Sequence, residues 1–296
     1  MRWAQLLREL GHRVIVTEPY DGQPCDVLVA LHARRSAGSI SRFRTHRPDA
    51  PVVLALTGTD LYRDLRTSAQ AMRSLDAADR IVVLQRLGAA ELPLEARRKT
   101  RVIFQSATRP GGVLAPKHRV FEVSVLAHLR PVKDPLRAAE ATRRLPTTSG
   151  IRVVHLGAAM SRGMERRARA AMRANPRYHW LGDQPRWKAL RLLARSRLLA
   201  LTSLLEGGAN VVSEAIACGV PVVSSRIPGS LGILGADYPG YFAVGDTAEL
   251  ADLLLRVETD QGFYQTLLDH CRGLGGLADP ALERASWRDL LAELFV

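Results

Sequence analysis

Apolar positions in the first hundred residues alternate between helical spacing and short uninterrupted runs. Trp3, Leu6, Leu7 and Leu10 recur at intervals of three and four and are followed by Gly11, which predicts an amphipathic helix over residues 2–10. Further apolar runs, separated by segments of helical pattern, lie at 13–17, 26–31, 52–56, 80–84 and 101–104. Runs that are apolar on both faces and spaced by helices are typical of a buried parallel sheet. We therefore expect a doubly wound α/β domain.

The same alternation restarts after a stretch rich in proline and glycine at residues 108–118, which predicts an interdomain linker. The expected strands of the second half are 121–126, 152–156, 178–181, 198–202 and 220–224. The expected helices are 134–145, 164–174, 186–195, 210–217 and a closing helix at 281–294. The pattern predicts two Rossmann-like α/β domains, over residues 1–118 and 119–296.

The first domain begins unusually, because no candidate strand precedes Trp3. An α/β domain of this kind ordinarily opens with a strand and a glycine-rich turn. We expect the first strand of this domain to be missing from the chain, which would leave a gap in the centre of its sheet. Upstream in-frame codons for a strand and a glycine turn would support this expectation.

Composition supports packed globular domains. The chain has 296 residues, of which 47% are hydrophobic and 24% charged, and that length favours two domains. Cys25, Cys218 and Cys271 are far apart and match no metal-binding or redox spacing, which favours a reducing cytoplasm and no structural zinc. The start lacks the apolar stretch of a signal peptide, and no apolar run is long enough to cross a membrane. A cytoplasmic location without membrane insertion is expected.

The net charge raises the question of nucleic acid. The chain has 42 Lys and Arg against 29 Asp and Glu, a formal charge of +13, but residues 198–296 carry only five basic and 13 acidic residues. Aromatic residues, which would stack on bases, make up only 5%. A basic nucleic-acid-binding protein is therefore disfavoured. Arginines on solvated helix faces, with a few cations for a small anionic ligand, explain the charge better.

The densest chemical signal follows the expected strand 198–202. Glu206, Gly207, Gly208, Ala209 and Asn210 form a loop leading into a helix, and free N–H groups at a helix start bind anions such as phosphate. Glu206 and Glu214 could each accept two hydrogen bonds from neighbouring sugar hydroxyls. Taken singly, Glu214 also fits an ordinary first-turn glutamate and the two glycines a plain loop. Their combination favours a site for a sugar diphosphate.

The motif from Glu206 to Glu214, followed by Ala-Ile-Ala-Cys-Gly-Val-Pro-Val, resembles the donor-site signature of glycosyltransferases with two Rossmann-like domains facing a cleft, the GT-B fold. The resemblance implies that Glu206 contacts the donor sugar, Glu214 the nucleotide ribose, and the amides of 207–210 the diphosphate. Leu181 joins the expected donor-binding residues.

A second match, in residues 125–135, places Lys133 where that family has a lysine bound to the donor diphosphate. His128 stands where the family has an arginine. Whether His128 or Arg130 supplies the second positive contact stays open at this point. An ordinary solvated lysine at a helix start is the alternative for Lys133.

A narrower resemblance covers both domains. Six segments are similar to the selenosugar synthases of selenoneine biosynthesis: residues 56–64, 82–85, 105–107, 128–133, 206–214 and 234–242. That family joins selenophosphate to the sugar of a UDP-sugar, forming a carbon–selenium bond with loss of UDP and of the phosphoryl group. The resemblance implies the same reaction here. A related GT-B enzyme with an alcohol acceptor is the alternative.

Selenophosphate is small and anionic, so charge and hydrogen bonds must hold it. The residues expected to bind this acceptor end strands of the first domain or lie one turn beyond, namely Thr57, Gly58, Thr59, Arg63, Gln85, Gln105 and Ser106. Thr57 and Thr59 could equally serve only to cap a helix. Because selenium is already ionised in such a molecule, Lys133, with Arg130 or His128 and the helix at Asn210, would act mainly by stabilising the departing diphosphate. We expect no metal and no cofactor. The transferred sugar, the anomeric outcome and the oligomeric state stay open.

Overall fold

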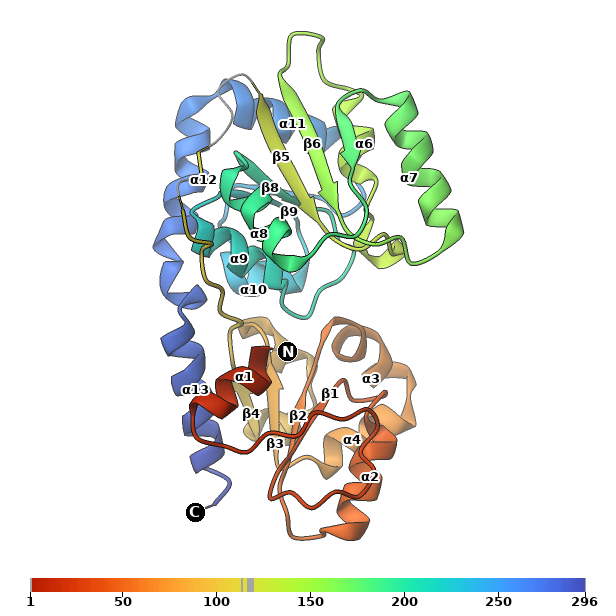
Figure 1. The fold of residues 1–296 in the computed structure, drawn as a ribbon, viewed down its shortest axis with the longest axis vertical. Coiled ribbons are helices and arrows are strands. Elements are labelled where there is room, and N and C mark those ends of the chain that lie inside the picture. Colours follow the sequence, from red (N-terminus) through yellow and green to blue (C-terminus); the bar gives the residue numbers. More distant parts are fainter. Residues whose placement is uncertain (1, 113, 116–119, 296) are drawn as a thin grey trace. The chain divides into compact units, whose positions relative to one another are not determined.

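The computed structural model describes residues 2–112, 114–115 and 120–295, and it contains two separate all-parallel sheets with helices around them (Figure 1). The described residues divide into two compact units. The N-terminal unit comprises residues 2–105, 206–208 and 280–295, and the C-terminal unit comprises the rest. The predicted α/β class with two parallel sheets is confirmed. Part of the predicted linker 108–118, at residues 113 and 116–118, lies outside the described residues.

The sheet of the N-terminal unit has the order β1-β2-β3-β4. Its strands are β1 (Leu28–Leu31), β2 (Val52–Ala55), β3 (Arg80–Val83) and β4 (Thr100–Val102). Successive side chains of β2 point to opposite faces, so Leu54 joins one hydrophobic core while Val53 joins the other. Both faces of this sheet are therefore covered, as a doubly wound sheet requires.

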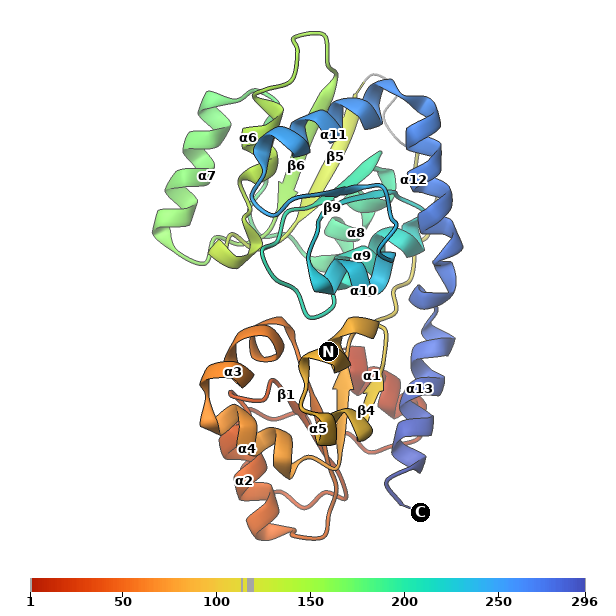
Figure 2. The ribbon, with the colours of Figure 1, turned by 180° about the vertical axis from the view of Figure 1, so that it is seen from behind.

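Helices of the N-terminal unit cover these two faces. Those present are α1 (Arg2–Glu9), α2 (Ala37–His46), η1 (Asp60–Asp64), α3 (Leu65–Thr67), α4 (Ala69–Ala77), η2 (Arg86–Glu91), α5 (Leu94–Arg98) and α13 (Pro280–Ala292). Ile40 and Phe43 of α2 and Leu75 of α4 pack on one face, whereas Leu7 of α1 and Trp287 of α13 pack on the other. Figures 1 and 2 both show α13 beside α1. The predicted closing helix thus groups with the N-terminal unit, a different assignment from the division at residue 118.

One expected strand is wrong. Residues 13–17 form no strand, and Ile15 and Val16 are about half exposed, at 47% and 52%. A strand persists only where a neighbour receives its backbone hydrogen bonds, and no described strand lies alongside this segment. The helix expected before it is confirmed as α1, and Gly11 has the left-handed φ of +92° that suits a residue just past a helix end.

The sheet of the C-terminal unit has the order β10-β9-β8-β5-β6-β7. Its strands are β5 (Phe121–Leu126), β6 (Ile151–Leu156), β7 (Tyr178–Trp180), β8 (Leu198–Leu201), β9 (Val222–Ser225) and β10 (Tyr241–Phe242). β5 and β8 are neighbours, but the chain runs from β5 to β6 on one side and from β8 to β9 on the other. The strand order therefore reverses between β5 and β8.

Helices of the C-terminal unit connect its strands or follow the last one. They are η3 (Pro131–Lys133), α6 (Arg137–Thr142), α7 (Arg162–Ala174), α8 (Arg186–Arg195), α9 (Asn210–Cys218), α10 (Pro228–Leu234), α11 (Thr247–Thr259), α12 (Gln261–Gly273) and η4 (Gly275–Ala278). Several begin at a side-chain cap, such as Asp246, whose carboxylate accepts from the N–H groups of Ala248 and Glu249. No helix among the described residues is long and apolar enough to cross a membrane.

Candidate functional site

The reversal between β5 and β8 marks the place where an open parallel sheet usually binds its ligand. At such a point the loops leaving two neighbouring strands diverge, and a crevice opens at their carboxyl ends. The loop after β5 contains His128, Arg130 and Lys133, and the loop after β8 leads to α9. The topology therefore brings two separately predicted motifs to one edge of the sheet.

Hydrogen bonds join these two loops. The Thr202 hydroxyl, just beyond β8, donates to the carbonyl oxygens of Lys133 and Asp134, at 3.1 and 2.9 Å. The Leu204 N–H donates to the Val132 carbonyl at 2.9 Å. The backbone of Lys133 is thus fixed to the end of β8, within the C-terminal unit.

The start of α9 carries the second predicted carboxylate. Glu214 is buried, and its Oε1 accepts from Asn210 Nδ2 at 3.0 Å and from Arg186 Nη1 at 2.5 Å. Arg186 begins α8, and its side chain is 58% exposed. Sequence reasoning missed Arg186, because nothing in its local pattern separates it from the many other arginines. α9 ends before Gly219, whose φ of +69° confirms the expected glycine stop.

The other predicted donor residues lie in loops. Glu206, Gly207 and Gly208 belong to the loop between β8 and α9 and group with the N-terminal unit, and Gly207 is buried. Ala209 is buried at the residue before α9. Leu181 follows β7 directly and is 50% exposed.

His128 and Arg130 present different chemistry at the end of β5. Nδ1 of His128 accepts from the Ala158 N–H at 3.0 Å, so the proton of a neutral His128 ring is on Nε2, which remains a donor. Arg130 is exposed, and its guanidinium has no hydrogen-bond partner within the described part of the chain. Both side chains can therefore donate to an anion.

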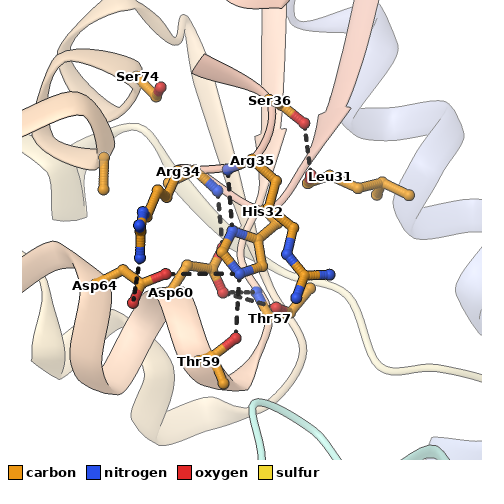
Figure 3. Close-up of polar contacts among 12 residues, drawn as sticks. Leu31, His32, Arg34, Arg35, Ser36, Thr57, Thr59, Asp60, Asp64 and Ser74 are labelled. Carbon is orange, nitrogen blue, oxygen red and sulfur yellow. Dashed lines mark hydrogen bonds and ion pairs between the residues drawn. The ribbon is translucent and has the colours of Figure 1, made fainter. Parts of the chain in front are cut away.

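In the N-terminal unit, Asp60 organises the segment after β2. It is fully buried, and its Oδ1 accepts from the N–H and the hydroxyl of Thr57 at 2.8 and 2.7 Å, as in a capping box (Figure 3). Its Oδ2 accepts from the Ala33 N–H at 2.9 Å, which ties the ends of β1 and β2 together. The Asp60 carboxylate thus caps this helix start by accepting from the Thr57 N–H, and Gly58 and Thr59 are half-buried in the first turn.

His32, which sequence reasoning missed, lies beside Asp60. It has a left-handed φ of +73°, uncommon for a histidine. Its Nε2 is 3.1 Å from the Thr59 hydroxyl and 3.8 Å from Asp64, and its Nδ1 accepts from the Arg35 N–H at 3.4 Å (Figure 3). Its place immediately after β1 is the signal that could have found it, because carboxyl ends of parallel strands share one edge.

Two arginines complete this cluster. Arg63 Nε donates to Asp64 Oδ1 at 3.0 Å, and Arg34 Nη1 lies 4.0 Å from the same carboxylate. Both guanidinium groups are more than half exposed, whereas Asp64 is buried. This edge of the N-terminal unit therefore presents two exposed arginines beside one buried carboxylate, that of Asp64.

The remaining residues predicted to bind the acceptor are less exposed than Arg63. Gln85 is fully buried, its Nε2 donates to the Tyr62 hydroxyl at 2.8 Å, and its Oε1 accepts from the Leu87 N–H at 2.5 Å. Burial raises the pKa of Tyr62 to about 12. Both polar atoms of the Gln85 amide thus have hydrogen-bond partners within the protein. Gln105 is half-buried and Ser106 buried, and the boundary between the two units falls between them.

Among the described residues, no group of three or more His, Cys, Asp or Glu side chains is arranged to hold a metal ion.

Comparison with known proteins decides the family. Residues 113–271, just over half of the chain, match the family described as glycosyl transferases group 1. The chain belongs to this family. The matched region contains both loops at the reversal between β5 and β8.

Individual proteins are similar to this chain in part of the sequence or in fold. The chain is 33% identical to N-acetyl-alpha-D-glucosaminyl L-malate synthase of Bacillus anthracis over 94 residues, which is 31% of this glycosyltransferase and only 24% of that enzyme. Its fold is similar to that of Anabaena HepE, solved in complex with UDP, with a TM-score of 0.74 at 17% identity over 90% of this chain and 79% of that one. The fold is also similar to that of sucrose-phosphate synthase from Thermosynechococcus elongatus, with a TM-score of 0.72 at 18% identity. This match covers 91% of this chain and 74% of that one.

Proposed function

We propose that this glycosyltransferase transfers a sugar from a UDP-sugar to selenophosphate. The observation that carries the donor half is the hydrogen-bonded junction of the Lys133 loop with the end of β8, next to the start of α9. Similar folds solved with UDP support a uridine nucleotide. In this proposal Glu206 contacts the donor sugar, Glu214 the ribose, and the amides from Gly207 to Asn210 the diphosphate.

Lys133 and His128 stabilise the departing diphosphate in this proposal. Lys133 has a backbone anchored by Thr202, so the site is organised before the reaction begins. His128 is our choice for the second contact, because the Ala158 N–H orients its ring and leaves Nε2–H to donate. Arg130 then adds longer-range positive charge. The protein's own donors hold the diphosphate charge, and the proposal needs no metal ion.

The acceptor half rests on the resemblance across both domains and on the exposed cations of the N-terminal unit. The selenium lone pair attacks the anomeric carbon, the bond from that carbon to the diphosphate oxygen breaks, and UDP leaves with the electron pair. The phosphoryl group is then lost from selenium to water. Arg63 with Thr59 would bind the acceptor oxygens, while Thr57 and Gln85 would support them from inside the fold.

A direct assay tests this function. The purified protein is incubated with a panel of UDP-sugars and selenophosphate, and mass spectrometry follows UDP and the selenosugar. Formation of both supports the proposal. UDP release with alcohols but not with selenophosphate would favour the related alcohol-acceptor enzyme, and salt-dependent DNA binding unaffected by UDP would overturn the glycosyl-transfer assignment.

Lys133→Ala tests the donor site. Because Lys133 would neutralise charge on the leaving diphosphate, we expect turnover to fall about 10²–10³-fold, the range for losing one preorganised donor. Lys188→Ala removes an exposed lysine of α8 and is the matched control. Initial rates of UDP release measure both variants. Unchanged turnover in Lys133→Ala would contradict the role given to this lysine.

A further inference from the structure

We propose that His155 is a positioning residue of the donor-diphosphate site, acting through the backbone of Ala127 and His128. The inference rests on the donor half of the proposed function and adds a residue that contacts no substrate. His155 lies in β6 and is fully buried. Its importance follows from what its two ring nitrogens hold.

The ring of His155 is fixed in one tautomer. Nε2 lies 2.8 Å from the Ala127 carbonyl oxygen, which can only accept, so Nε2 carries the proton. Nδ1 then accepts from the Tyr178 hydroxyl at 2.8 Å. Burial lowers the pKa of His155 to about 4, so the neutral ring that this arrangement requires is the form present at pH 7.

The Ala127 carbonyl belongs to the peptide that leads directly into His128. On either side of it the backbone is joined to the end of β6: the Ala127 N–H donates to Leu156 at 3.0 Å and the Leu129 N–H donates to Ala158 at 2.9 Å. The Ala158 N–H in turn donates to the His128 ring. Of the two carbonyls between these N–H groups, His155 holds that of Ala127.

Close packing leaves this carbonyl no alternative position on the side of β6. A Cβ added to Gly157, the residue after β6, would lie 1.9 Å from the Ala127 oxygen, so the backbone there is already close to it. Trp180 Nε1–H also holds Gly157 by donating to its carbonyl at 2.8 Å. Without His155, the Ala127 carbonyl and the Tyr178 hydroxyl lose buried partners, and the peptide before His128 can rotate.

Calorimetry measures UDP binding to the full chain, to four single variants, and to His128→Ala with and without His155→Leu. His155→Leu removes both hydrogen bonds and Tyr178→Phe removes one. His155→Gln keeps a donor for Ala127 and an acceptor for Tyr178. Val153→Ala creates a cavity in the same strand while keeping the hydrogen bonds of His155 and Tyr178, and it controls for destabilisation. Thermal unfolding identifies a temperature at which every variant compared is folded.

We expect His155→Leu to weaken UDP binding about tenfold and Tyr178→Phe about threefold, whereas His155→Gln and Val153→Ala stay within about twofold of the wild type. In a His128→Ala background the effect of His155→Leu should shrink below about threefold, because the two residues act through one path. If His155→Leu does not fold, Tyr178→Phe carries the same comparison.

Equal losses in Val153→Ala and the His155 or Tyr178 variants would overturn the positioning role, as would undiminished losses in the His128→Ala background. A wild type that does not bind UDP would overturn the donor half of the proposed function, and this inference with it. The variant results just described would overturn only the role of His155 and would leave the proposed function intact. A failure of the inference can therefore be distinguished from a failure of the proposed function.

Discussion

Three polar residues show how different the surroundings and hydrogen-bond partners of buried polar side chains are in this protein. His155 is fully buried in the C-terminal unit, and each of its ring nitrogens has a hydrogen-bond partner. His32 instead lies at a strand end beside two carboxylates and exposed arginines. Asp60 is fully buried, yet three hydrogen bonds satisfy its carboxylate. Sequence alone placed Thr57 correctly at a helix start but could not assign Asp60 or His32, because their partners come from other strand ends.

The neutral ring of His155 predicts a pH effect on stability. Its folded-state pKa of about 4 lies below the ordinary value of 6.5, so the unfolded chain binds a proton first as pH falls. Stability from this group is complete above pH 6.5 and is lost progressively toward pH 4. From pH 7.5 to pH 5 the wild type should lose about 2 kcal/mol more than His155→Gln in denaturant unfolding. Parallel pH curves for the two proteins would contradict this assignment.

At the scale of elements, apolar periodicity found most of the core. The strands expected near 52, 80, 121 and 198 are present, and the helix predicted over 186–195 is α8 with the same bounds. The strand predicted over 13–17 is absent, because a strand depends on a neighbouring strand, which the local sequence pattern does not reveal. The two-residue strand β10 was missed because so short a segment has no readable period.

Two glycines of the C-terminal unit should respond oppositely to alanine. Gly157→Ala forces a Cβ to 1.9 Å from a backbone oxygen, so we expect a loss of several kcal/mol or failure to fold, about 4 kcal/mol being a strong effect for one substitution. Gly163 lies in α7, where an added Cβ meets only the Ser161 hydroxyl at 3.8 Å. Gly163→Ala should leave stability unchanged or raise it by up to about 1 kcal/mol. Urea unfolding measures both, and a tolerated Gly157→Ala would show that Gly157 does not confine the Ala127 carbonyl.

At the scale of the whole chain, the last helix completes the first unit. Trp287 of α13 is fully buried with Leu290 and Leu291 on the face of the sheet that α1 also covers. A segment that begins 225 residues after the end of β2 (Ala55 to Pro280) thus closes its core. The amphipathic pattern predicted the helix but not the sheet against which it packs, since several apolar faces in this chain could accept it.

Trp287→Ala should lower the free energy of unfolding of the N-terminal unit by about 3–5 kcal/mol, the usual cost of truncating a buried tryptophan. Trp187→Ala, at a 60% exposed position in α8, is the matched control and should change stability by less than about 0.5 kcal/mol. Hydrogen exchange should show protection lost in peptides of β1–β4 while β5, β6 and β8 keep theirs. Equal loss in both sheets would mean that the two units unfold as one.

The sequence by itself determined the α/β class, most strands and the two motifs that we propose for the donor, because burial periodicity and glycine-containing helix starts are local properties. Only the tertiary structure decided that the Lys133 loop and the β8 loop are hydrogen-bonded neighbours, that Glu214 pairs with Arg186, and that His155 holds the peptide before His128. These features depend on which strands lie side by side. Strand order is set by long-range packing, which no window of sequence contains.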